Sequence, residues 1–242
     1  MVTVRHTGAV NQLDVGALSG QYVSLEPLRV EHVDDLASAG AGDRSTFDYT
    51  QVPDGTADAA AYVAWLLDDA ANGRAAPFVQ RRVADRTIVG CTRFLNPQWP
   101  LSRPHPDEVE IGGTWLAVAA QRSPINTEAK LLLLTHAFEV WQVQRVAICT
   151  DARNTRSRRA IERIGAEFEG VLRRHRRSTR AGDGDRLRDT ASYSVTIDDW
   201  PSVAGHLRGL RHLLQLRSRR GGLRTGRLRH RRLRYRLGRL RL

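Results

Sequence analysis

Hydrophobic positions recur along the chain with two different periods, and these periods predict the order of its elements. Alternation at every second position predicts a strand, and recurrence every three to four positions predicts a helix. The order strand, two helices, three strands, helix, strand, helix, two strands indicates one α/β domain built around a sheet. Strands are predicted over residues 22–28, 77–84, 87–95, 108–118, 145–150, 168–175 and 188–197. Helices are predicted over residues 31–39, 58–71, 125–141 and 154–164, and a last short helix begins at Asp199-Trp200-Pro201.

The stretch 110–164 carries the candidate site. An apolar strand runs into a short polar turn, and the turn opens directly into a helix. Asn126, Thr127 and Glu128 stand where a helix start needs capping residues and first-turn acids. The free N–H groups of such a start, with its positive dipole end, bind an anion such as a pyrophosphate. An ordinary capped helix without a ligand explains the same residues, and both interpretations stay open at this point.

Three motifs in this stretch resemble the GNAT superfamily of acyl-CoA-dependent N-acyltransferases. They are the strand E-I-G-G-T-W-L, the turn Q-R-S-P-I-N-T-E-A-K and the later D-A-R-N-T-R-S-R-R-A-I-E-R-I-G-A. The chain looks most like the branch of ribosomal-protein N-terminal acetyltransferases, and the resemblance covers about residues 25–200. It implies the GNAT fold, an α/β (α+β) arrangement with a mixed, mostly antiparallel twisted sheet of about seven strands flanked by four or five helices. One departure is that the two glycine positions of the superfamily turn hold Pro124 and Asn126.

The resemblance also implies where acetyl-CoA binds. Its pantetheine arm would pair with the strand edge at Leu116, Ala117 and Val118, and its pyrophosphate would lie on the turn that follows. Pro124 has no N–H group, so one of the usual donors is absent, and Arg122 and Thr127 can replace that contact with charge and a hydroxyl. The turn residues assigned to the pyrophosphate are Gln121, Arg122, Ser123, Pro124, Ile125, Asn126 and Thr127.

Two further residues stand at the start of the next helix. By resemblance, Asn154 bonds the pantetheine amides and Ser157 protonates the leaving thiolate; an Asn-x-x-Ser sequence also caps a helix without any ligand. Arg158 and Arg159 approach the adenosine phosphate in this interpretation, although a solvated helix face explains them equally well.

The general base and the acceptor side are predicted less directly. Glu110 begins the central strand and could order a water next to the amine, or it is simply a surface carboxylate at a strand end. Phe47 and Tyr49, with the proline-rich loop 96–106, are expected to line the acceptor side. His136 falls on the apolar side of a helix and is expected to be a core histidine.

Charge is distributed unevenly along the chain. The net charge is +12, and residues 207–242 hold 14 arginines and no acid, so residues 1–206 carry 12 − 14 = −2. We therefore expect a lead-in over 1–20, an acyltransferase domain over 21–206 and a low-complexity, disordered basic tail over 207–242. The tail is either a non-functional, even altered-frame, extension or an arm that binds nucleic acid or ribosomes; its leucines also suit a membrane surface.

The remaining composition excludes several classes. Cys91 and Cys149 lie far apart in apolar segments, and no Cys/His spacing suggests a metal, so no metal cofactor is expected. The N-terminus lacks a signal-peptide pattern and no apolar run reaches the roughly 20 residues of a membrane span, so a cytoplasmic protein without a membrane partner is expected.

The resemblance implies transfer of an acetyl group from acetyl-CoA to a primary amine by direct attack, because no residue looks like an activated nucleophile. A protein N-terminus is the first acceptor and a small amine the second, and succinyl-CoA stays open as donor. The alternatives are a non-catalytic scaffold that binds CoA and a nucleic-acid-binding protein that acts through its tail. The oligomeric state stays open, a homodimer included.

Overall fold

The computed structural model describes residues 13–180, 182–211 and 213, and in it one sheet organises the chain. Its strand order is β1-β2-β3-β4-β5-β6-β8-β7, and among these strands β5 and β6 form the parallel pair while every other pair is antiparallel. The strands are β1 (Leu18–Ser19), β2 (Val23–Pro27), β3 (Ala75–Arg82), β4 (Ile88–Gln98), β5 (Glu108–Leu116), β6 (Arg145–Asp151), β7 (Glu167–Arg177) and β8 (Leu187–Thr196).

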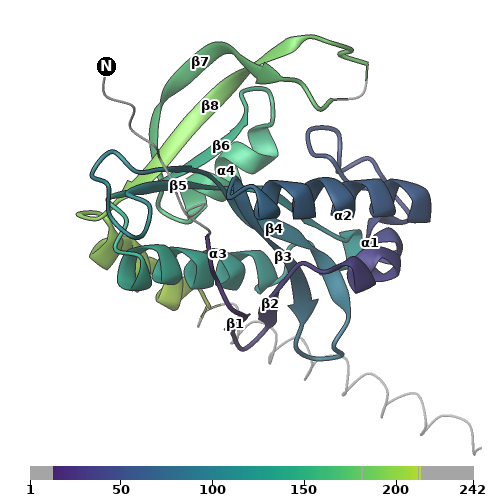
Figure 1. The fold of residues 1–242 in the computed structure, drawn as a ribbon, viewed down its shortest axis with the longest axis horizontal. Coiled ribbons are helices and arrows are strands. Elements are labelled where there is room, and N and C mark those ends of the chain that lie inside the picture. The colour runs from purple at the N-terminus through teal and green to yellow at the C-terminus, as the bar shows by residue number, and fades with distance from the viewer. Residues whose placement is uncertain (1–12, 181, 212, 214–242) are drawn as a thin grey trace, which may run out of the picture.

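Helices cover the two faces of this sheet (Figure 1). The helices α1 (Val33–Gly40) and α2 (Thr56–Ala71) pack on one face, over a core that includes Leu36, Leu66 and Trp115. The helices α3 (Ile125–Thr135) and α4 (Thr155–Arg163), with a helical segment over 200–211, pack on the other, over a larger core that includes Ile111, Leu133, Ile161 and Leu207. The predicted mixed, mostly antiparallel α/β fold is confirmed.

The helix α3 starts at Ile125 as predicted, but its capping residue differs from the prediction. Pro124 occupies the N-cap position with φ −63° and ψ −17°, and no side chain caps the helix. Because the proline ring holds φ at a helical value, the helix begins at Ile125 and Asn126 lies inside it. The prediction of Asn126 as a cap was therefore wrong, whereas Glu128 does lie in the first turn.

The far end of the same helix is also irregular. The α-helical hydrogen bonding stops at Thr135, and His136–Val140 form a π-helical turn. In this turn His136 packs between the rings of Phe94 and Trp141, with centroids 6.2 and 4.8 Å away. Burial, and then the nearby His105, lower the pKa of His136, which agrees with the expected core histidine.

Both predicted domain boundaries fall inside packed structure. Leu13 and Val15 are buried in the core, ahead of the boundary drawn at residue 20. The last helical segment continues to residue 211, beyond the boundary drawn at 206, and Leu207 is fully buried.

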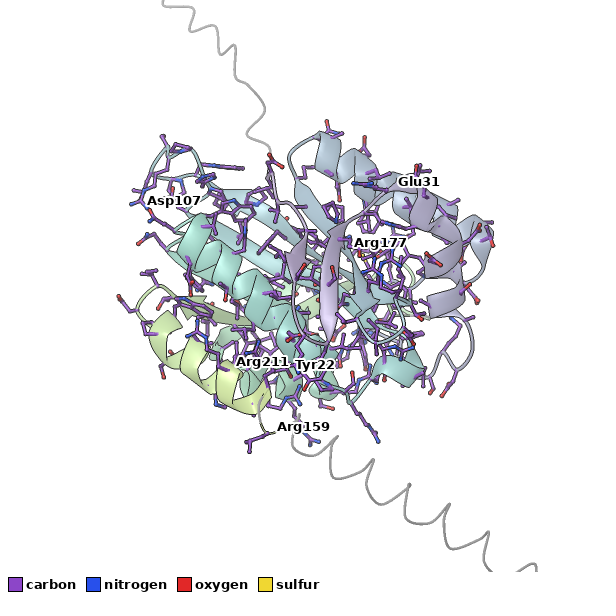
Figure 2. All side chains as sticks on the ribbon, turned by 90° about the horizontal axis from the view of Figure 1, so that it is seen from below. Tyr22, Glu31, Asp107, Arg159, Arg177 and Arg211 are labelled. Carbon is purple, nitrogen blue, oxygen red and sulfur yellow. The ribbon has the colours of Figure 1, made fainter. Side chains whose placement is uncertain are left out.

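The two ends of the described chain meet at one buried carboxylate. The side chain of Glu128 accepts hydrogen bonds from the backbone N–H groups of Tyr22, at 2.5 Å, and Val23, at 3.0 Å. It also lies 3.6 Å from the guanidinium of Arg211, and Figure 2 shows Tyr22 and Arg211 beside each other at this point. Most of the predicted basic tail lies outside the described residues. Within the described residues, no helix has both the length and the apolar character needed to cross a membrane.

Candidate active site

The parallel strands β5 and β6 separate part-way along their length. They pair at Glu108↔Arg145, Val109↔Val146 and Glu110↔Ala147, and no later residue of β5 pairs with β6. Beyond that point β6 stays paired with β8 as far as Asp151, while β5 follows β4. The edge of β5 over residues 111–116 is therefore without a strand partner on the β6 side.

A bulge in β5 accompanies this separation. Its register against β4 shifts by one residue between Gly112 and Trp115. Gly113 adopts φ +56°, a left-handed conformation that favours glycine. The sequence G-G-T in the strand motif therefore marks the place where β5 bulges and changes direction.

A cavity of about 850 Å³ fills the space between the two strands and extends over the loop before α2. The free segment of β5, the turn before α3, the first turn of α4 and the end of β7 all contribute side chains to it. The structure brings ten of the predicted site residues together around this cavity. They are Phe47, Tyr49, Glu110, Leu116, Gln121, Arg122, Ser123, Asn126, Asn154 and Ser157.

Six other predicted residues do not line the cavity, and their placement explains why. Strand β5 ends at Leu116, so Ala117 and Val118 lie beyond it; the N–H of Ala117 already donates to the carbonyl of Val89 at 2.7 Å. Pro124 forms the helix cap, and the side chains of Ile125 and Thr127 point into the core, where they are 3% and 1% exposed. The strand edge left unpaired by β6 is residues 111–116, and it shares Leu116 with the predicted pantetheine edge. The contact with pantetheine itself stays a prediction.

Arg158 is the sixth of these residues. Its Nε donates to the hydroxyl of Tyr193 at 3.0 Å, and its guanidinium lies over the ring of Phe168 at 5.2 Å. Two neighbours on α4, Arg156 and Arg159, line the cavity instead. The helix starts at Thr155, and its rotation decides which arginines face the cavity.

The turn before α3 is held in place by a polar contact between three segments. Gln121 donates to the hydroxyl of Thr46 and to the carbonyl of Leu116, both at 3.0 Å. Arg156 donates to the carbonyl of Thr46 at 2.8 Å and to the side-chain oxygen of Gln121 at 3.3 Å. The helix start and the arginines beside it form a site with positive potential, which suits an anion.

The first turn of α4 presents Ser157 to the cavity. Asn154 occupies the N-cap position, and its side-chain oxygen accepts a hydrogen bond from the N–H of Ser157 at 3.0 Å. The helix-capping interpretation of Asn154 is confirmed. Asn154 also borders the cavity, which is compatible with its predicted contact with pantetheine. That contact stays a prediction.

Glu110 is not the surface carboxylate that one interpretation expected. Its side chain is buried, and Arg176 donates to both of its oxygens at 2.9 and 2.7 Å. Asn96 donates to the second oxygen at 2.9 Å, and the contact with Glu110 raises the pKa of Arg176. These contacts hold the Glu110 carboxylate in one orientation within the cavity, as a residue that orders a water molecule would need to be.

Lys130, the one lysine of the chain, is a cavity residue that the sequence motifs did not single out. It lies one turn after Asn126 on α3, and its Nζ donates to the hydroxyl of Thr114 at 2.7 Å. Burial lowers its pKa to about 7. The sequence feature that could have identified Lys130 is its position, four residues after Asn126 on the apolar side of the same helix.

The part of the cavity where the acceptor was expected has aromatic walls. Phe47 packs against Trp115 with a centroid distance of 6.3 Å, and the indole N–H of Trp115 donates to the hydroxyl of Tyr62 at 3.2 Å. Tyr49 lies under the guanidinium groups of Arg153 and Arg180, at 5.7 and 5.6 Å. Asn96 is the residue of the predicted acceptor loop 96–106 that borders the cavity. It belongs to β4, which continues to Gln98.

A family model described as the acetyltransferase (GNAT) domain matches residues 23–167, more than half of the 242-residue chain. The chain belongs to the GNAT family. This membership classes it with the acyl-CoA-dependent N-acyltransferases and confirms the resemblance drawn from the three motifs. A cavity between the separated β5 and β6 is thus found in a chain whose family acts on acyl-CoA.

Solved GNAT structures resemble this chain over most of its length. A GCN5-related N-acetyltransferase from Brucella melitensis is 26% identical with a TM-score of 0.71, and the similarity covers 83% of this chain and 87% of that one. A candidate acetyltransferase from T. thermophilus is 31% identical with a TM-score of 0.68, over 81% of this chain and 97% of that one.

A curated GNAT relative matches over a shorter stretch. The candidate ribosomal N-acetyltransferase YdaF of Bacillus subtilis (strain 168) is 43% identical over 61 residues. That stretch is 25% of this chain and 33% of YdaF, so the chain spans about a third of the length of this relative. The relative belongs to the branch that the motifs resemble.

Proposed function

We propose that this GNAT protein transfers an acetyl group from acetyl-CoA to a primary amine by direct attack of the amine on the thioester. The observation that carries the proposal is the continuity of one cavity, which joins the free edge of β5 to the start of α3 and to the first turn of α4. A free strand edge can pair with the pantetheine amides, and a helix start can bind the diphosphate. The polar first turn of α4 can then contact the thioester.

The donor lies along the free edge of β5 in this proposal. The backbone of residues 111–116 pairs with the pantetheine amides, and the turn from Gln121 to Asn126 binds the pyrophosphate with Arg122, Arg156 and Arg159 around it. Two structures of similar fold support this placement, since a Mycobacterium smegmatis RimJ contains CoA-disulfide and the self-immunity acetyltransferase MccE contains acetyl-CoA and AMP. Acetyl-CoA is a co-substrate here, and the proposal needs no metal.

The chemistry needs a neutral amine, a polarised carbonyl and a proton for the leaving thiolate. Glu110 orders the water that accepts the proton of the attacking amine, and its ion pair with Arg176 fixes its orientation. The nitrogen then bonds to the carbonyl carbon, the carbon–sulfur bond breaks, and the hydroxyl of Ser157 protonates the thiolate. The water next to Glu110 releases the amine proton to solvent, and Ser157 takes up a proton from solvent. The products are an amide and free CoA.

The acceptor proposed first is a protein N-terminus, and a small amine comes second. The similarity to YdaF, a candidate ribosomal N-acetyltransferase, supports the first. The aromatic walls around Phe47 and Tyr49 are compatible with either, because both a peptide and a small amine present apolar surface. The donor proposed first is acetyl-CoA, with succinyl-CoA as the alternative.

A turnover assay tests this proposal on the full-length protein. Released CoA thiol is measured with acetyl-CoA against peptides with free N-termini and against small amines, and calorimetry measures CoA binding in parallel. We expect saturable thiol release that depends on the amine, and an acetylated product by mass. Tight CoA binding without turnover on any amine would instead identify a scaffold that binds CoA, and no CoA binding would reject both interpretations.

A further inference from the structure

Three arginines from three strands line the cavity. Arg93 of β4, Arg176 of β7 and Arg188 of β8 form what we call the arginine cluster. The guanidinium of Arg93 lies directly against Gly113, with Nε 2.9 Å from the position that a Cβ there would take. The carboxylate of Glu110 lies against the preceding Gly112 in the same way, at 3.3 Å. The two glycines of the β5 bulge therefore leave room for one cationic and one anionic side chain.

The charges of this group do not balance. Glu110 is the carboxylate of the cluster, and Arg176 engages both of its oxygens. Asp69, which also borders the cavity, pairs with Arg74 at 2.8 Å, and Asp151 is bound through both oxygens by Arg153. Among the described residues, neither Arg93 nor Arg188 forms an ion pair with a carboxylate. The arginine cluster therefore carries two guanidinium groups in excess.

Part of that excess is buried. The Nε and Nη1 atoms of Arg93 and the Nε of Arg188 are inaccessible to water and have no hydrogen-bond acceptor in the part of the chain that the structure describes. Burial, and then the neighbouring Arg176, lower the pKa of Arg188, so the protein environment opposes its charge. An unpaired buried cation is costly, and proteins retain one where a ligand completes it.

The orientation of Arg93 suits such a ligand. Its guanidinium stacks on the ring of Trp65 with a centroid distance of 4.6 Å. Stacking uses the face of the guanidinium plane, so the N–H donors at its edge gain no acceptor from Trp65. A preformed fork of this kind binds two oxygens of one anion at once.

We propose that the arginine cluster binds a carboxylate or phosphate carried by one of the two substrates, with Arg93 and Arg188 as its donors. This inference rests on the proposed acyl transfer and adds the substrate class to it. The anion belongs either to the amine acceptor, as in an acidic amine or peptide, or to the acyl group of the donor, as in succinyl-CoA. Either source would bring a negative group to the free segment of β5, along which the donor is proposed to bind.

Binding is measured first, because it does not depend on turnover. Full-length protein saturated with CoA is titrated with succinate and with its neutral analogue succinamide in a calorimeter. We expect succinate to bind at least about tenfold more tightly, and Arg93→Gln and Arg188→Gln each to remove most of that preference. Arg81→Gln is the matched control, because Arg81 lies outside the cavity and pairs with Glu26 at 2.9 Å. It removes the same charge and should keep the preference.

Kinetics then separate the two sources of the anion. One arm compares the amidated dipeptides Ala-Glu and Ala-Gln as acceptors of acetyl-CoA, and the other compares succinyl-CoA with butyryl-CoA as donors to Ala-Gln amide. An about tenfold higher kcat/KM for the acidic member of one pair, reduced in the Arg93 and Arg188 variants, assigns the anion to that substrate.

Equal binding of succinate and succinamide, or a preference that Arg81→Gln abolishes as well, would overturn the inference. Turnover of both members of each pair at equal rates would overturn it too, and would leave the proposed acetyl transfer intact. Selective succinate binding with no turnover on any amine would support the anion site and count against the transferase function.

Discussion

The amine nitrogen of Lys130 lies 2.7 Å from the hydroxyl oxygen of Thr114, and the hydroxyl of Thr114 lies 2.8 Å from that of Thr92. These contacts connect α3 to the free segment of β5 and to β4, beneath the place where the thioester is expected. Lys130 is 6% exposed and has no carboxylate partner within the described residues. The cavity therefore contains a lysine that is readily neutral.

Lys130→Met should change how stability depends on pH. The pKa of Lys130 is about 7 in the folded protein against an ordinary 10.5, so between these values the unfolded chain binds the additional proton. Stability of the wild type should therefore rise with pH in this window, by up to about 1.4 kcal/mol per unit from this group. Below pH 7 the variant should be the more stable protein, and its advantage should shrink from pH 7 to 10.

Urea unfolding at pH 6, 8 and 9.5 measures this difference. Arg177→Met is the control, because the exposed Arg177 pairs with the exposed Asp185 and does not lose its charge in this range. A stability difference between wild type and Lys130→Met that stays constant with pH would show that Lys130 keeps its proton throughout.

Glu110→Gln should lower both stability and kcat. Arg176 would lose its bidentate partner inside the cavity, which costs on the order of 3 kcal/mol for a buried pair. The double variant Glu110→Gln/Arg176→Gln removes both charges and should recover much of that stability. Its kcat should stay low if Glu110 orders the catalytic water. Recovery of kcat along with stability would reduce Glu110 to a structural role.

Ser157→Ala should lower kcat by about a hundredfold with little change in the KM for acetyl-CoA, because the thiolate would leave without its proton donor. Asn154→Ala is the comparison on the same helix start. It removes the cap that bonds the N–H of Ser157 and should cost about 1 kcal/mol of stability. A Ser157→Ala enzyme with unchanged kcat would mean that another group or water supplies the proton.

Arg156→Gln and Arg158→Gln should differ in their effect on CoA affinity. Arg156 lies on the cavity and holds Gln121 and Thr46, so its loss should weaken CoA binding about tenfold. Arg158 is engaged by Tyr193 outside the cavity and should have little effect. Calorimetry with CoA decides between them, and the reverse order would restore the assignment made from the sequence motif.

The elements of the fold were predictable because their signals are local. Apolar periodicity located both hairpins, the four main helices and the paired strands on either side of the site. It missed β1, since a strand of two residues has no period to detect. The cap of α3 was placed at Asn126 from residue preference, which does not take account of the helical φ that Pro124 imposes.

The candidate site was predictable where a motif is continuous in sequence. The turn from Gln121 to Asn126 and the pair Asn154 and Ser157 were identified in this way. The structure places Asn154, Ser157 and four residues of the turn on the cavity, namely Gln121, Arg122, Ser123 and Asn126. Arg158 does not border the cavity whereas Arg156 and Arg159 do, because a run of arginines on a helix does not reveal which of them faces inward. Lys130 and Arg93 were missed, since each stands among apolar residues without a partner nearby in sequence.

The amino-acid sequence by itself determined which segments form strands and helices, that the chain is a GNAT acyltransferase, and that a polar turn precedes the long helix. Only the tertiary structure decided that β5 leaves β6 after Glu110, and that Glu110 pairs with Arg176, 66 residues away. Periodicity and capping act between neighbours along the chain. Ion pairs, buried cations and the pKa of Lys130 instead depend on which strands and helices pack together, because desolvation and charge act through space.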